Sequence, residues 1–596
     1  MKSRHVNLLR LMATLSILPS LSLVPAGFAG KAMAQTVANS ASPSPDRRQK
    51  DDDVLNEFRM MGRMYDIGGS LARNDDLALY WYQRAAANGD MRAISNIANH
   101  YYDGRGVPKD IDKARQLYEQ AAAAGVTVAM TNLGYHYYVG DGLAKDYTIA
   151  RSWYQKAADA GDPIGYLYLG YIFSNGFGVT EDHVIAHGWF EKAANKLDAR
   201  AMEELGVDFQ QGVGVPLDFA KARDWFMKAA AGGVGDAMNN LGWMYERGQG
   251  VAVDLQAALD WYRKSADAGS ADGTNNLGRM YRTGTGVPQD YAKALDLFEK
   301  AAGLGNNYAN YNAAMLYERG LGVAQDPVKA IEWHQKAADK GDPDSEYELG
   351  GFYMRGEGTD QNFAKAKDLF ERAFQGGNAK AGNEVGQLYL NASGVEQDYS
   401  KALDWYRRAA AAGDGSGMTN IGLMYHDGLG VEKDVAKAAE WYQKAADAGN
   451  AFGMENLGAM YRDGDGVPQD YSKAYSLFRK SSELGDAAST NEVGRLYEDG
   501  NGVSKNPQEA ARWYQAAAEG GDSYAMTNLG SLYENGTGVD QDYAAAMTWY
   551  QKGADAGNHY AMEGIANLYE KGLGVKRSKA KAAEWRKKAK VAKKNS

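Results

Sequence analysis

The feature that most constrains this chain of 596 residues is a repeat of 36 residues. Glycine pairs spaced as G-x-G recur at this interval from Gly104 to Gly572. One degenerate copy, with Gly68 and Ser70, precedes them, and another copy has Ala392 in place of the first glycine but keeps the interval. Fifteen copies thus fill residues 55–594 without an insertion. A period of this length is typical of supersecondary units that cannot bury their apolar faces alone and therefore stack on their neighbours. The chain is predicted to be one long array.

Each repeat begins with an amphipathic segment, such as residues 237–248 with the sequence AMNNLGWMYERG. Met238, Leu241 and Tyr245 recur at i, i+3 and i+7, which indicates one face of a helix. Tyr or Phe occupies the Tyr245 position in all fifteen copies, and only Gly or Ala occupies the Gly242 position. Because a mid-helix Gly costs about 1 kcal/mol relative to Ala, we expect the paired helix to approach closely there.

A second segment follows, and its first position is Asp in eleven copies, Asn in three and Ser in one. These residues cap the N-termini of helices. Four residues later Ala is invariant, and three residues beyond it comes Trp in eleven copies and Leu in four. A small residue beside a large aromatic one predicts a knob and a notch between stacked repeats. Gly fills thirteen of the fourteen positions between repeats, as expected for helix C-caps, and Leu197 is the exception.

The shared pattern is LG-x-MY-x-x-G-x-GV-x-x-D-x-x-KA-x-x-WY-x-KAA-x-x-G. It closely resembles the Sel-1-like repeat family, which is related to the tetratricopeptide repeats, over about nine-tenths of the chain. The resemblance implies an all-α, right-handed superhelical solenoid of about fifteen helix-turn-helix repeats. It also implies that first helices line the inner face and second helices the outer face. Such a fold offers a long binding surface rather than a pocket.

The N-terminus has the three parts of a secretory signal peptide. A basic start precedes an apolar stretch, and Ala32-Met33-Ala34 forms an A-x-A cleavage site. We therefore expect residues 1–34 to be removed, and residues 35–53 to form a disordered, polar leader. No later stretch is apolar enough for an integral membrane segment. The predicted localisation is periplasmic or secreted.

No constellation in the sequence predicts catalysis, a cofactor or a metal site. The chain has no Cys, and none of the G-x-G turns extends to a nucleotide-binding motif. His183 and His187 have the i, i+4 spacing of zinc ligands but lack further local ligands, which favours a structural or surface role. An S-x-x-K match at Ser578 and Lys581 lacks the companion motifs of acylating serine enzymes. Although some cysteine-rich family members have been associated with β-lactamase activity, a β-lactamase-like hydrolase is a remote alternative here.

Two histidines, His100 and His136, occupy the same position in adjacent repeats, where other copies mainly have Met or Leu. If both are partly buried, their protonation near pH 6 would loosen this junction. The alternative is that they are two half-exposed polar substitutions. The sequence leaves both readings open.

The charge of the chain is divided between an acidic array and a basic end. Residues 35–570 carry a net charge of −24, whereas residues 571–596 contain eleven Lys or Arg against one Glu. The acidic field disfavours nucleic acid as a partner. We interpret residues 576–596 as a basic C-terminal capping helix and tail. The alternative is contact of this tail with an anionic surface.

Packing imposes the same residue types on every repeat, whereas a ligand imposes no such uniformity. Candidate binding residues are therefore expected at variable positions of the first helices. The positions of Leu167, Tyr171 and Ser174 form a second stripe at i, i+4 and i+7. Exposed aromatic residues are common anchors for protein partners and sugar rings. The predicted partner-binding residues in and beside this stripe are Tyr102, Tyr135, Tyr138, Tyr168, Tyr171 and Trp243.

These observations predict a noncatalytic scaffold or adaptor for protein–protein interactions in the bacterial envelope or outside the cell. The partner would be another protein bound along the concave face of the solenoid. A module that binds carbohydrate or peptidoglycan of the envelope, through the same tyrosines, is the alternative.

Overall fold

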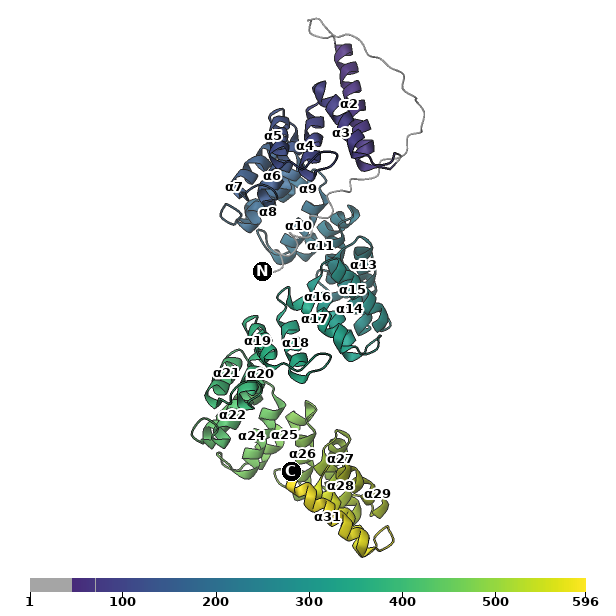
Figure 1. Cartoon of the computed structure of the whole chain (residues 1–596). Coiled ribbons are helices and arrows are strands. Elements are labelled where there is room, and N and C mark those ends of the chain that lie inside the picture. Colours follow the sequence, from purple (N-terminus) through teal and green to yellow (C-terminus); the bar gives the residue numbers. More distant parts are fainter. Residues whose placement is uncertain (1–44, 70, 596) are drawn as a thin grey trace. The chain divides into compact units, whose positions relative to one another are not determined.

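The computed structural model describes residues 45–69 and 71–595, and the expected signal peptide lies outside this range (Figure 1). Within the described residues all regular secondary structure is helical. The chain divides into two compact units, one ending at Ala309 and one beginning at Asn310. Each unit is a stack of antiparallel helix pairs joined by short turns. The predicted all-α repeat fold is confirmed.

Every repeat contributes two helices, most of them thirteen residues long. The first helices are α2 Pro45–Ile67, α4 Met91–Asp103, α6 Thr127–Val139, α8 Pro163–Asn175, α10 Ala199–Gln211, α12 Gly235–Arg247, α14 Ala271–Thr283, α16 Asn307–Arg319, α18 Pro343–Arg355, α20 Ala379–Leu390, α22 Gly415–Asp427, α24 Ala451–Asp463, α26 Ala487–Asp499, α28 Ser523–Asn535 and α30 His559–Lys571. The second helices are α3 Asp75–Ala87, α5 Ile111–Ala123, α7 Tyr147–Asp159, α9 His183–Ala194, α11 Phe219–Ala231, α13 Leu255–Asp267, α15 Tyr291–Gly303, α17 Pro327–Ala338, α19 Phe363–Gln375, α21 Tyr399–Ala411, α23 Val435–Asp447, α25 Tyr471–Glu483, α27 Pro507–Glu519, α29 Tyr543–Asp555 and α31 Lys579–Asn595.

The N-terminal boundary of the array differs from the prediction. Helix α2 begins at Pro45, so residues 45–53 are helical and not part of a flexible leader. Proline is favoured in the first turn of a helix because its missing N–H has no partner to lose there. The remainder of α2 packs on α3 through Phe58 and Tyr65, and a helix once formed extends at little cost.

Caps and turns divide the repeats as the sequence predicts. In the second helices the capping side chain accepts a backbone N–H, as Asp254 does from Ala257 at 2.9 Å. First helices end at a left-handed glycine, such as Gly248 with φ of 70°. Leu197 and Ala392 keep the left-handed conformation without being glycine, with φ of 65° and 56°. They are the only non-glycine residues with positive φ in the described chain.

The glycines inside the first helices mark the closest approach of each helix pair. A Cβ atom added to Gly242 would lie 2.7 Å from the ring of Tyr262, and all twelve glycines at this position face a Tyr or Phe ring in the same way. Two of the three copies with Ala lack that ring, since Ala314 is paired with His334 and Ala566 with Arg586. The close approach predicted from this position is therefore confirmed.

First helices lie on the inner side of each stack. Consecutive first helices contact one another, for example α12 with α14 and α28 with α30, whereas no two second helices of the described chain come as close. The tryptophans of the second helices help to join neighbouring repeats, because Trp261 packs on a core cluster that runs from Leu167 to Met244 and includes Phe226 of the preceding repeat. The variable positions of the first helices are therefore expected to lie on one face of each stack.

Candidate partner-binding face

We define the inner face as the side chains at the fifth, sixth, ninth and twelfth positions of the first helices. These positions lie between the buried packing positions and include the predicted stripe. In helix α12 they are Asn239, Asn240, Trp243 and Glu246, none of which is fully buried.

Two of the predicted anchors are well placed for contact with a partner. Trp243 is 36% exposed, and the guanidinium of Arg247 lies 4.7 Å from the centre of its ring. Tyr135 is half-buried, and its ring is roughly perpendicular to the rings of His136 and Tyr168. Both side chains present a large, rigid surface on the inner face.

Tyr102 and Tyr171 are held more firmly. The hydroxyl of Tyr102 donates to the carboxylate of Asp141 in the next repeat, and burial together with this carboxylate raises the pKa of Tyr102. Tyr171 packs against the ring of Phe190 at 5.6 Å, and burial raises its pKa. These tyrosines join adjacent helices as well as lining the inner face.

Tyr138 and Tyr168 belong to the core and are not accessible anchors. They are 4% and 7% exposed. Tyr168 stacks in parallel on Tyr154 at 4.6 Å, and Tyr138 meets Phe177 edge-on at 5.7 Å. The aromatic packing of this junction thus buries two tyrosines whose positions otherwise belong to the inner face.

The two histidines of this region, His100 and His136, are both buried. His136 lies 3.9 Å from the ring of Tyr102, and burial lowers its pKa to about 4. His100 is fully buried, its Nδ1 donates to the carbonyl of Arg105 at 2.8 Å, and its Nε2 lies 3.6 Å from Asp66. The expectation of a switch near pH 6 is therefore wrong for His136.

The other motifs singled out in the sequence have structural roles. His187 Nδ1 lies 3.0 Å from the buried carboxylate of Asp208, which belongs to the first helix of the next repeat. His183 contacts Glu181 at 2.6 Å. The hydroxyl of Ser578 accepts the N–H of Lys581 at 3.3 Å, as a helix cap does.

Carboxylates with raised pKa values are spread along the inner face of the second unit. Burial raises the pKa of Glu348, Glu384 and Glu455. Repulsion from Glu318 adds to the effect at Glu348, and repulsion from Asp486 adds to it at Glu455. Desolvation and like charges disfavour the ionised form of these carboxylates. A cationic group bound on this face would stabilise that form.

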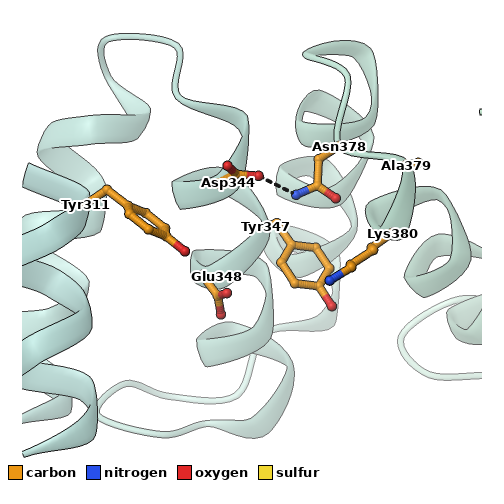
Figure 2. Close-up of a pocket in the computed structure, with 7 residues that line it drawn as sticks. All are labelled: Tyr311, Asp344, Tyr347, Glu348, Asn378, Ala379 and Lys380. Atoms are coloured by element: carbon orange, nitrogen blue, oxygen red, sulfur yellow. Dashed lines mark hydrogen bonds between the residues drawn. The ribbon is translucent and has the colours of Figure 1, made fainter. Parts of the chain in front are cut away.

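A pocket of about 450 Å³ lies on this face between α16, α18 and α20 (Figure 2). Asp344 is held by the side-chain amide of Asn378, which donates to it at 2.9 Å. The figure shows Glu348 between two tyrosines from adjacent repeats. The residues that line the pocket are Tyr311, Asp344, Tyr347, Glu348, Asn378, Ala379 and Lys380.

The sequence reasoning missed the two tyrosines of this pocket, although a signal was present. Tyr311 and Tyr347 are 36 residues apart at the position of Leu167, which the predicted stripe contains. The stripe of the later repeats is mainly polar or charged, which makes this aromatic pair inconspicuous in the sequence.

Comparison with known proteins matches the family description "Sel1 repeat" to fifteen consecutive segments. The segments are 59–90, 92–126, 127–162, 163–196, 199–234, 235–270, 271–306, 307–342, 343–378, 379–414, 415–450, 451–486, 487–522, 523–558 and 559–590. The chain belongs to the Sel1 repeat family.

Solved structures that are similar to this chain include other Sel1 repeat proteins. One is a protective antigen present in uropathogenic Escherichia coli strains, with an SLR fold, 30% identity and a TM-score of 0.53. The alignment covers 83% of this chain and 97% of that one. A Sel1 repeat protein from Oxalobacter formigenes is 28% identical, with coverage of 56% and 94% and a TM-score of 0.44. No curated protein matches the chain.

Sel1 repeat solenoids are generally scaffolds for protein interactions, and they are typically noncatalytic. For this member of the Sel1 repeat family, none of the helices that the structure describes has the length and apolarity needed to cross a membrane.

Proposed function

We propose that this Sel1 repeat protein is a noncatalytic scaffold or adaptor of the bacterial envelope or the extracellular space. It binds a partner protein along the inner face of its first helices. The observation that carries the proposal is the contrast between conserved and variable positions. The packing positions repeat from copy to copy, whereas the inner face varies, with most of its aromatic side chains in the first unit and most of its carboxylates in the second.

The chemistry of the inner face supports a protein as the partner. Trp243 and Tyr135 offer exposed or half-exposed aromatic surface, which is frequent at the energetic centre of protein interfaces. The carboxylates of the second unit complement basic side chains. Export is proposed from the signal-peptide pattern of residues 1–34, and the E. coli relative is a protective antigen.

Substitution of Tyr135 and Trp243 by Ala tests the proposal. The double variant should lose at least about tenfold in affinity for the envelope partner, because central aromatic anchors contribute about 2 kcal/mol or more to binding. Tyr80→Ala is the matched control, since Tyr80 is an exposed tyrosine on the second helix α3. Circular dichroism checks that the helices are intact.

The partner is isolated by cross-linking in the native envelope, and its affinity for the purified chain is then measured. If the double variant and the control bound the partner with equal affinity, this part of the inner face would be excluded as the binding site. Binding to immobilised peptidoglycan fragments that exceeds binding to any protein would favour the carbohydrate alternative instead.

A further inference from the structure

Three polar groups without partners line the pocket of the second unit. The carboxylate of Glu348 forms no hydrogen bond or ion pair with any residue that the structure describes. The hydroxyls of Tyr311 and Tyr347 likewise have no hydrogen-bond partner in the described chain. The neighbouring carboxylate, Asp344, is already engaged by Asn378. Glu348 is therefore the acceptor that the fold leaves open.

The tyrosine rings are fixed by packing, so the pocket is preformed. Tyr347 lies 5.7 Å from the ring of Phe370, and Tyr311 lies 5.6 Å from the ring of His334. Both contacts are with second helices behind the inner face. A binding site whose walls are already ordered loses less conformational entropy when a ligand enters.

The charges around the pocket favour a cation. Burial and repulsion from Glu318 raise the pKa of Glu348 despite the opposing charges of His334, Arg355 and Arg319. Arg355 pairs with Glu357 at 3.2 Å instead. Burial, with the negative charges of Glu384 and Glu348, raises the pKa of Tyr347 to about 12. Lys380 is the one cation that lines the pocket.

We propose that this pocket takes an arginine or lysine side chain from the partner protein. Resting on the proposed function, this inference names the chemistry by which the inner face recognises its partner. The cationic group pairs with the carboxylate of Glu348, and its charge lies against the faces of Tyr311 and Tyr347. A volume of about 450 Å³ is ample for one long side chain.

The test uses the full chain and short probes of known chemistry. Acetyl-Gly-Gly-Arg-Gly-Gly-amide is titrated at low salt and its binding is followed by saturation-transfer NMR. The same peptide with lysine, and with citrulline as the uncharged isostere of arginine, is compared. We expect the citrulline peptide to bind at least about fivefold more weakly than the arginine peptide, because only the cation gains from Glu348.

The variant Glu348→Gln should weaken binding of the arginine peptide about fivefold and leave the citrulline peptide unchanged. Tyr347→Phe keeps the aromatic face and should retain most of the binding. Glu440→Gln is the matched control, since it removes an exposed carboxylate from the second helix α23, outside the inner face. Circular dichroism confirms that each variant is folded.

Equal binding of the arginine and citrulline peptides, or an unchanged affinity of Glu348→Gln, would overturn the proposal. Preferential binding of an N-acetylglucosamine trimer would also overturn it and favour a sugar. Failure of this proposal is distinct from failure of the proposed function. In the first case the envelope partner still binds and Glu348→Gln has no effect on it, whereas in the second no inner-face variant changes partner capture.

Discussion

At the scale of single residues, the repeat shows at which positions one copy has a different residue from the other copies. Leu197 and Ala392 occupy turn positions that are otherwise glycine, and the backbone remains left-handed at both. The neighbouring copies thus determine the conformation of the turn more strongly than the residue in it. A non-glycine residue in this region carries a strain of about 1 kcal/mol.

The change Leu197→Gly should therefore stabilise the chain by about 1 kcal/mol, since it relieves this strain. Leu197 is 82% exposed, so little packing is lost. Denaturant unfolding measures the change. Gly161→Ala is the reverse control and should destabilise by a similar amount, because no heavy atom lies within 4 Å of the added Cβ and only the backbone conformation opposes it. A loss of stability in Leu197→Gly would show that the side chain matters more than the turn.

His136 predicts a pH dependence of the early repeats. Its pKa in the folded chain is about 4, below the usual value of about 6.5, so the unfolded chain binds more protons between these values. The stability of the fold with a neutral His136 imidazole is fully present above pH 6.5 and is lost as the pH falls toward 4. Because His136 is only 7% exposed, we expect about 2 kcal/mol of local stability to be lost over this range.

The opening free energy of α6, measured by hydrogen exchange at pH 7 and pH 4.5, checks this dependence. His136→Met introduces a residue that is common at this position in other copies. It should reduce the pH dependence of the opening free energy. Titration of the His136 imidazole near pH 6.5 in an NMR experiment would contradict the burial on which the prediction depends.

At the scale of helices, neighbouring repeats are joined by hydrogen bonds between asparagines of consecutive first helices. The side-chain amide of Asn420 on α22 donates to Asn383 on α20 at 2.7 Å. The same bond recurs between Asn276 and Asn239 at 2.8 Å. These bonds fix the register of one first helix against the next along the inner face.

Asn420→Ala should lower the stability of this junction by about 1 to 2 kcal/mol, because the buried oxygen of Asn383 is left without its donor. Asn456→Ala is the matched control. Asn456 occupies the same position one repeat later but donates only to the carbonyl of Phe452 within its own helix. Hydrogen exchange of α20 and α22 should respond to the first change alone. Equal effects of the two variants would show that the bond between repeats contributes nothing.

The sequence predicted the helices far better than the binding face. Capping residues recur in all fifteen copies, and the turn glycines and the packing glycine recur in most of them, so each copy supports the interpretation of the others. The inner face has no such redundancy. Tyr138 and Tyr168 are buried because Tyr154 and Phe177 supply aromatic partners in that junction, which no single column reveals. The pocket around Tyr347 needs three helices from three repeats and becomes visible only in the folded stack.

At the scale of the whole molecule, a stack of repeats needs a terminal element that covers the apolar side of its last helix. Helix α31, the second helix of the last repeat, covers the first helix α30 and buries Ala582 and Ala589, each 2% exposed. Trp585 packs against the cluster that contains Tyr550 and Ile565. This packing supports the interpretation of residues 576–596 as a cap, while contact of the tail with an anionic surface stays a prediction.

Deletion of residues 576–596 should therefore destabilise the last repeat and promote self-association, since it exposes the apolar side of α30. Analytical ultracentrifugation and hydrogen exchange of α29 and α30 measure both effects. Lys587→Gln with Lys590→Gln keeps the helix and removes charge from its exposed side, so it should leave the chain monodisperse. If the deletion were harmless while the charge change caused association, the tail would serve solubility through charge and not as a cap.

The most direct test of the account is site-specific photo-crosslinking in the native envelope. A photoreactive residue is placed at Tyr135, Trp243 or Tyr347 on the inner face, and at Asp224 or Glu440 on exposed positions of second helices. The account predicts that a discrete partner protein is cross-linked from the inner positions and from neither outer position. Cross-links from the outer positions alone would contradict the claim that the first helices form the binding face.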